Sequence, residues 1–83
     1  MEKLTLSNAQ FQQMIINDED YKELSLEQLE EKVNKGAEIV EKNKGFYGLE
    51  SKLEENEMLE VAAFIDYRTA KKDLGEFVEE IDD

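Results

Sequence analysis

The sequence predicts an all-α protein, a small bundle of three to four helices in which two helices form an antiparallel hairpin. Three observations support this prediction: two matched helix-start signals, apolar residues that recur every three or four positions, and the absence of proline. Such recurrence places apolar side chains on one face of a helix, and without proline nothing forces the helices to break. The length fits one acidic helical domain over residues 1–83.

The first helix is predicted from the stretch LSNAQF at residues 6–11. The hydroxyl of Ser7 can cap the helix, and the side chain of Gln10, three residues later, can accept a hydrogen bond from the Ser7 amide. Leu6 and Phe11, on either side of this pair, can pack together as a hydrophobic staple. We expect a helix over residues 8–16, followed by a polar exit at residues 17–20. Three apolar side chains of this helix should face inward: Phe11, Met14 and Ile15.

The second helix repeats the start signal in LSLEQL at residues 24–29. Gly36 weakens this helix by about 1 kcal/mol relative to alanine, which is tolerable. Its end is signalled over residues 42–45, because lysines favour the carbonyl end and Gly45 suits the left-handed residue beyond it. It should begin near Leu26 and bury one face: Leu26, Leu29, Val33, Ala37 and Val40.

Apolar residues return after Gly48 and continue to Ile81. The five-residue step from Leu53 to Met58 interrupts the helical spacing, so a break or bend is expected near residues 55–57. The spacing then continues through Gly75, which favours one long final helix over a stop, with Leu74, Phe77, Val78 and Ile81 among its apolar positions.

We expect the second helix and the segment that follows Leu49 to form the antiparallel hairpin, with the first helix packed across it. The N-terminal stretch KLTL can be extended, but a lone strand has no obvious partner.

Composition excludes several kinds of site. The chain has no cysteine and no histidine, so disulfides, zinc-thiolate sites and the commonest proton-transfer side chain are missing. The longest apolar run, residues 61–65, is far shorter than the roughly 20 residues that cross a bilayer. The N-terminal residues also lack the basic and apolar regions of a signal peptide. We therefore expect a soluble cytoplasmic protein that does not bind membranes.

Motifs for catalysis, metals and phosphate are missing as well. A calcium loop counted from Asp18 fails, because Lys22 falls at its fifth position and Glu23 occupies the position that requires glycine. Asp66 lies in the most apolar part of the chain, and pairing with Arg68 or a nearby lysine explains it better than a catalytic role. We expect a protein that is not an enzyme and needs no cofactor or metal.

Charge is the clearest indication of function. Twenty-two acids against ten bases give a net charge of −12, and such a field repels nucleic acids and anionic membranes but attracts basic protein surfaces. The small basic cluster at residues 68–72 cannot outweigh this field, so direct nucleic-acid binding is not expected. The acids fall in three blocks, which either keep the protein soluble or form a surface for a basic partner.

The stretch NKGFYGLES at residues 43–51 places two aromatic residues between two glycines. In one interpretation it is a structural corner, where Phe46 folds back onto the helical hairpin and Tyr47 stays at the rim. In the other it is an aromatic tip that inserts into a partner. We favour the corner.

Two functional hypotheses follow. In the first, the protein binds and inhibits a basic nucleic-acid-binding protein by imitating a phosphate backbone; its lysine, glutamate, asparagine and isoleucine content suits an AT-rich bacterial or bacteriophage genome. In the alternative, it is a structural or adaptor protein that docks or oligomerises, for example as a homodimer, through an apolar helical stripe. An inhibitor should group its acids on one surface, whereas an adaptor should expose an apolar patch. The candidate partner-binding residues are Glu27, Glu30, Glu31, Glu54, Glu55, Glu57, Glu60, Phe46 and Tyr47.

Overall fold

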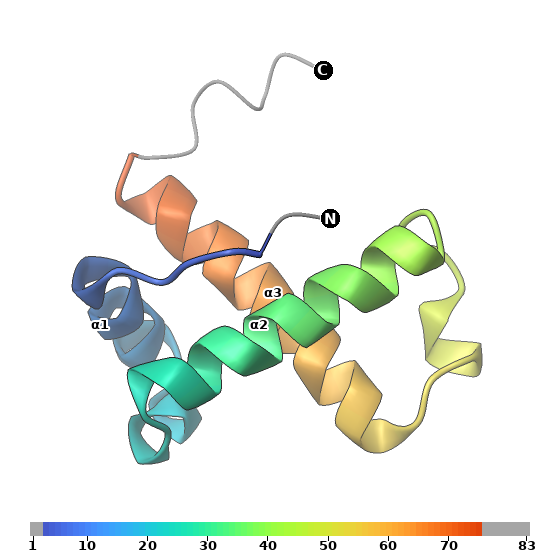
Figure 1. Cartoon of the computed structure of the whole chain (residues 1–83), viewed down its shortest axis with the longest axis horizontal. Helices are drawn as coiled ribbons and strands as arrows, with labels where there is room; N and C mark the ends of the chain where they lie inside the picture. The colour runs from blue at the N-terminus through green and yellow to red at the C-terminus, as the bar shows by residue number, and fades with distance from the viewer. Residues whose placement is uncertain (1–2, 76–83) are drawn as a thin grey trace.

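The computed structural model describes residues 3–75, and this part of the chain is helical with no strand (Figure 1). The prediction of a small all-α bundle is confirmed, with three α-helices and no fourth within the described range. The elements are α1 (Asn8–Asn17), the short 3-10 helix η1 (Glu19–Glu23), α2 (Leu26–Lys42), a second 3-10 helix η2 (Leu49–Ser51) and α3 (Glu55–Asp73).

Both predicted helix starts are confirmed by their hydrogen bonds. The Gln10 amide donates to Ser7 Oγ at 3.2 Å, and the Ser7 amide donates to Gln10 Oε1 at 2.9 Å. Ser25 and Gln28 make the same reciprocal bonds at the start of α2, at 3.1 and 2.9 Å. Each pair satisfies two backbone groups that the first turn of a helix leaves open.

The start of α3 has no serine, and the sequence predicts here only a break or bend near residues 55–57. Residues 55–57 form its first turn, and the Glu54 amide donates to the Glu57 carboxylate at 3.0 Å. The five-residue step from Leu53 to Met58 therefore marks the start of α3. The short helix η2 lies in the connection between α2 and α3.

The end of α2 lies at Lys42 as expected, but the left-handed residue is Lys44 (φ 61°), followed by Gly45 at φ 132°. The Lys44 amide donates to the Glu41 carbonyl at 3.2 Å, and the Gly45 amide donates to the Val40 carbonyl at 2.9 Å. These two bonds form a Schellman motif. The sequence predicts Gly45 as the left-handed residue, but that residue is Lys44, one position earlier. Gly45 follows it with a φ of 132°, which glycine adopts freely and other residues adopt only with strain.

The prediction that the last helix continues through Gly75 is wrong. The α3 helix ends at Asp73, Gly75 adopts φ 76°, and its amide donates to the Lys72 carbonyl at 3.0 Å. Apolar spacing carries no information on φ, and here the left-handed glycine ends the helix. The predicted apolar positions Phe77, Val78 and Ile81 lie outside the described residues.

The core forms where the three α-helices and the N-terminal segment meet. In α1, Met14 is fully buried, while Phe11 and Ile15 are half-buried. Of the face predicted for α2, Leu26 and Val40 are half-buried and the other three residues are buried. The buried cluster comprises Leu6, Met14, Leu29, Val33, Ala63, Tyr67 and Ala70.

The α2 and α3 helices cross each other at a steep angle near the middle of the molecule (Figure 1). At Gly36 the two backbones are so close that an added Cβ would lie 2.0 Å from the Glu60 carbonyl oxygen and 3.0 Å from Phe64 Cβ. The glycine that the sequence presents as a tolerated weakness in α2 is therefore the residue that permits this close approach.

The N-terminal segment is extended, and side chains of α2 take the place of a strand partner. Asn34 accepts from the Leu4 amide at 2.7 Å and donates to the Leu4 carbonyl at 2.9 Å. Glu30 accepts from the Leu6 amide at 2.8 Å. The expected difficulty of a lone strand is thus resolved by two polar side chains one turn apart.

Candidate functional site

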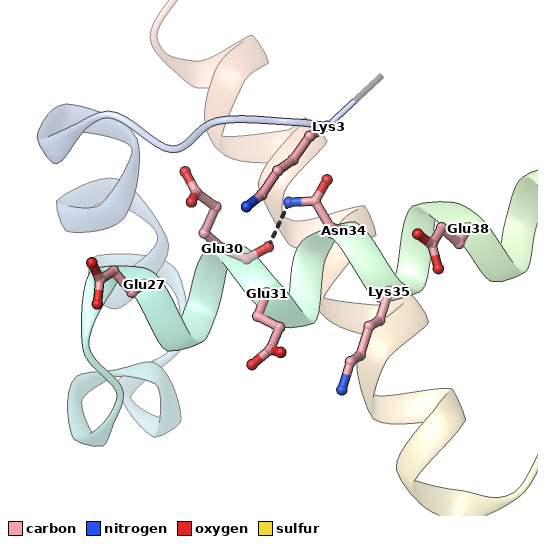
Figure 2. Close-up of a pocket in the computed structure, with 7 residues that line it drawn as sticks. All are labelled: Lys3, Glu27, Glu30, Glu31, Asn34, Lys35 and Glu38. Atoms are coloured by element: carbon pink, nitrogen blue, oxygen red, sulfur yellow. Dashed lines mark hydrogen bonds between the residues drawn. The ribbon is translucent and has the colours of Figure 1, made fainter. Parts of the chain in front are cut away.

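Acidic side chains gather along one face of α2, in a surface hollow of about 580 Å³. The hollow lies between α2 and the N-terminal segment, and Figure 2 shows Lys3 reaching over it from that segment. Four carboxylates face two lysines there, so negative charge dominates. The lining residues are Lys3, Glu27, Glu30, Glu31, Asn34, Lys35 and Glu38.

Three of these carboxylates form a row, which we call the α2 acidic row: Glu27, Glu31 and Glu38. They lie four and seven residues apart, close to whole numbers of helical turns, so they follow one line along the helix at separations of roughly 6 and 10 Å. All three side chains are exposed. Lys35 lies between the second and third of them, and it is also exposed.

Glu30 differs from its neighbours. It is one of the candidate partner-binding residues, but it is half-buried, and its carboxylate accepts a hydrogen bond from the Leu6 amide. Its own carbonyl accepts a bond from Asn34 Nδ2 at 2.8 Å, drawn as the dashed line in Figure 2. Glu30 therefore holds the N-terminal segment, and any change to it alters the fold as well as the surface charge.

The other four candidate acids lie around the start of α3, with Glu54 as its N-cap residue, and none of them lines the hollow on α2. Glu54 and Glu55 are exposed, while Glu57 and Glu60 are half-buried. Carboxylates in the first turn stabilise a helix because they face its positive end. The candidate acids therefore fall into two groups on different helices.

The carboxylates of the α2 acidic row make no ion pair with another of the described residues. Within residues 3–75, the lysine–carboxylate pair that the structure gives is Lys22 with Glu19, at 4.0 Å and largely exposed. Exposed pairs of this kind contribute about 0–1 kcal/mol. The carboxylates of the α2 acidic row are thus available to an external cation.

The corner at residues 43–51 folds back through Phe46. Its ring stacks on Phe64 of α3 with centroids 6.4 Å apart and an interplanar angle of 20°. Phe46 is 42% exposed and Tyr47 is 98% exposed. Phe46 thus contributes to the packing of the corner, as the structural interpretation expects, and Tyr47 projects fully into solvent.

Asp66 has a partner that the sequence did not indicate. We expected Arg68 or Lys71, but its carboxylate accepts a hydrogen bond from the Tyr21 hydroxyl of η1. The pKa of Tyr21 is raised, mainly because burial disfavours the phenolate, and further because of the bond to Asp66 and the charges of Asp66, Asp18 and Asp20. Asp66 is therefore a tertiary contact between η1 and α3.

The expected cation partners of Asp66 lie over aromatic rings instead. The guanidinium of Arg68 is 5.9 Å from the centroid of Phe64, and Lys71 Nζ is 5.5 Å from the centroid of Tyr67. Both distances lie within the range of cation–π attraction.

The structure was also searched for membrane-spanning helices and for clusters of metal-binding side chains. No helix in the described range has the length and apolar character needed to cross a bilayer. Nor do residues 3–75 contain a group of three or more histidine, cysteine, aspartate or glutamate side chains placed to hold a metal ion.

Comparisons with known proteins add no relatives, since no protein-family model, curated protein or solved structure matches this chain.

Proposed function

We propose that this chain is a non-catalytic acidic protein that occupies the nucleic-acid-binding surface of a basic protein and thereby inhibits it. The observation that supports the proposal best is the α2 acidic row, three exposed carboxylates in line on one rigid helix. A nucleic-acid-binding groove presents lysine and arginine side chains to a regular series of anions. A row of carboxylates can satisfy the same cations.

The physical requirements of such binding are charge, rigidity and access. The net charge of −12 supplies long-range attraction to a basic partner. The α2 helix holds the row in place with a capping box at its start and a Schellman motif at its end. The side chains need no ordering beyond their own rotamers, which limits the entropy cost of association.

The acids at the start of α3 provide a second, smaller group. Glu54 and Glu55 are exposed there, and they can extend the contact with a partner that is larger than the α2 face. A source in a bacteriophage or another mobile element belongs to the same proposal and rests on composition alone.

The test is capture of partner proteins from an extract of the source cells on the immobilised chain. We expect basic nucleic-acid-binding proteins to be retained at low salt, to elute with duplex DNA, and to elute steeply as salt rises, because screening shortens the range of the attraction. Retention that neither DNA nor salt reverses would contradict the proposal.

A matched pair of variants separates the row from net charge. Each glutamate-to-lysine reversal adds two charges, so a variant with three reversals changes −12 to −6 wherever they are placed. The row variant carries Glu27→Lys, Glu31→Lys and Glu38→Lys, and the control carries Glu23→Lys, Glu41→Lys and Glu50→Lys, all at exposed positions. Glu30 is left intact because it holds the N-terminal segment. The row variant should lose capture and the control should keep most of it; equal loss would mean that position is irrelevant.

A further inference from the structure

The N-terminal segment, residues 3–6, is held by the helices in the way that a receptor holds an extended peptide. Asn34 of α2 accepts a hydrogen bond from the Leu4 amide at 2.7 Å and donates one to the Leu4 carbonyl at 2.9 Å. This double contact recognises main-chain groups, which every residue except proline offers in full. Figure 1 shows the segment beside α2 and across α3, and residues 3–6 belong to no helix or strand.

Two further side chains continue this contact along the segment. Glu30 of α2 accepts a hydrogen bond from the Leu6 amide at 2.8 Å, and the Tyr67 hydroxyl of α3 donates one to the Thr5 carbonyl at 3.3 Å. Polar side chains of two helices thus satisfy main-chain groups of three consecutive residues. Main-chain hydrogen bonds of this kind give affinity in many peptide complexes, while pockets for alternate side chains give selectivity.

Alternating leucines supply the selective part of the contact. Leu6 is 6% exposed within the buried cluster, Leu4 is half-buried and packs against that cluster, and Thr5 between them is exposed. Successive side chains of an extended chain point to opposite sides, so leucines two positions apart reach the same surface. Lys3, the residue before them, lies over the hollow that is lined mainly by carboxylates (Figure 2). The surface therefore fits a basic residue followed by leucine, any residue and leucine.

The segment can leave this position without disturbing a helix. Its hydrogen bonds to α2 and α3 go to side chains rather than to the backbones of these helices. Ser7 and Gln10 close the first turn of α1 between themselves, so the start of α1 does not depend on the segment. Departure uncovers the apolar surface beneath the two leucines, and another segment with the same leucines can cover it again.

We propose that Glu30, Asn34, Tyr67 and the apolar surface beneath the leucines form a recognition site for an extended segment of a partner protein, with the pattern basic residue–Leu–any residue–Leu. We call it the segment-binding site. Residues 3–6 occupy it as an intramolecular inhibitor, and the partner's segment replaces them. A tethered competitor acts at an effective concentration of about millimolar, so it lowers the apparent affinity of any segment that is added from outside.

A labelled peptide with the sequence of residues 2–8, EKLTLSN with blocked ends, tests the site by fluorescence anisotropy with the full chain. The wild type should bind it weakly, because its own segment competes. Leu6→Ala weakens that competitor and leaves the hydrogen-bonding side chains of the site in place, so the affinity for the peptide should rise by about tenfold or more. Leu4→Ala should raise it less, because Leu4 is only half-buried.

Two matched controls test the recognition itself. The peptide EKSTSSN, in which serine replaces both leucines, should not bind. In the Leu6→Ala chain, Asn34→Ala removes the double contact with the main chain and should lower the affinity for EKLTLSN by about tenfold or more. Asn56→Ala, at an exposed position in the first turn of α3, should leave that affinity unchanged.

This inference does not depend on the proposed function, and salt distinguishes the two. EKLTLSN with blocked ends has one acid and one base, so its binding should change little as salt rises. Binding of a basic protein to the α2 acidic row should weaken steeply under the same conditions, because salt screens charges. Either result can therefore fail while the other holds.

Circular dichroism shows whether each variant is folded. A variant that unfolds should be refolded by saturating EKLTLSN, because a ligand of the folded state stabilises that state. Four outcomes would overturn the proposal: no gain in peptide affinity in either leucine variant, equal binding of the serine peptide, equal effects of Asn34→Ala and Asn56→Ala, and an unfolded variant that the peptide does not refold.

Discussion

The hydroxyl of Tyr21 donates a hydrogen bond to the carboxylate of Asp66, across 45 residues of sequence. This bond joins η1 to α3 and so fixes the connection between α1 and α2 against the last helix. Tyr21 is half-buried with acids around it, and its phenolate would face the negative charge of Asp66 directly. The bond is therefore compatible only with the neutral phenol.

Alkaline pH should destabilise the fold through Tyr21. Its pKa is raised in the folded chain above the ordinary value of about 10, so the unfolded chain loses this proton first as pH rises. The stabilisation is complete below about pH 10 and is lost at higher pH. Denaturant unfolding at neutral and alkaline pH measures the free energy of unfolding. In the wild type it should fall as pH rises above about 10, and in Tyr21→Phe it should fall less. An equal fall in both proteins would contradict the prediction.

Asp66→Asn tests the cause of that shift. The amide keeps an oxygen that can accept the Tyr21 hydrogen bond but removes the carboxylate charge, so the pKa of Tyr21 should fall toward its ordinary value. The absorbance of tyrosinate during a pH titration measures this. Because burial is the larger cause, the return should be incomplete, and a complete return would show that charge outweighs burial.

Gly36→Ala should destabilise the protein, although helix propensity alone predicts a gain of about 1 kcal/mol. The added Cβ would lie 2.0 Å from the Glu60 carbonyl oxygen, which is backbone and cannot rotate away. Forcing the helices apart should cost about 1–3 kcal/mol or more. Lys35→Ala, one residue earlier on an exposed position, is the control and should be near neutral. Chemical denaturation measures both, and a stabilised Gly36→Ala variant would show that the crossing is looser than described.

Asn34→Asp should release the N-terminal segment while it preserves side-chain shape. The aspartate can still accept the Leu4 amide but cannot donate to the carbonyls of Leu4 and Glu30. Loss of two donated bonds should cost about 1–3 kcal/mol. Hydrogen exchange at the Leu4 and Leu6 amides should quicken, whereas Glu31→Gln should leave both unchanged; unchanged exchange in Asn34→Asp would mean that apolar packing alone holds the segment.

Salt should raise the melting temperature. Acids outnumber bases by 22 to 10, and the structure gives little ion pairing in the described range to offset their repulsion. Screening relieves that repulsion more in the compact state than in the expanded one. Thermal unfolding monitored by circular dichroism at increasing sodium chloride measures the effect. A falling melting temperature would reveal favourable charge pairs that salt weakens.

Local chemistry explains what the sequence predicted well. A capping box joins residues three apart, so Ser7 with Gln10 and Ser25 with Gln28 can be recognised without knowledge of the fold. Of the α2 acidic row, Glu27 and Glu31 are among the residues that the sequence predicts, whereas Glu38 is not, although spacings of four and seven place all three on one line once the helix is known.

The features that the sequence missed depend on contacts between distant residues or on single dihedral angles. Gly36 and Glu60 meet only because two helices cross, and Glu30 turns inward only because Leu6 lies over it. The stop at Gly75 depends on its positive φ, which the apolar pattern around it does not reveal. The two tertiary contacts leave no short-range pattern, whereas lysines followed by a glycine at residues 71–75 repeat the signal that predicts the end of α2.

The hydrogen bonds of the N-terminal segment also determine when this segment can become fixed. Leu6 depends on Glu30 and Leu4 on Asn34, 24 and 30 residues later, and the Thr5 carbonyl accepts the hydroxyl of Tyr67, 62 residues later. Contacts so distant in sequence form only after the intervening chain has been brought together. Because synthesis proceeds from the N-terminus, these residues leave the ribosome well before their partners on α2 and α3. The first part of the described chain to be made is thus among the last to reach its final place.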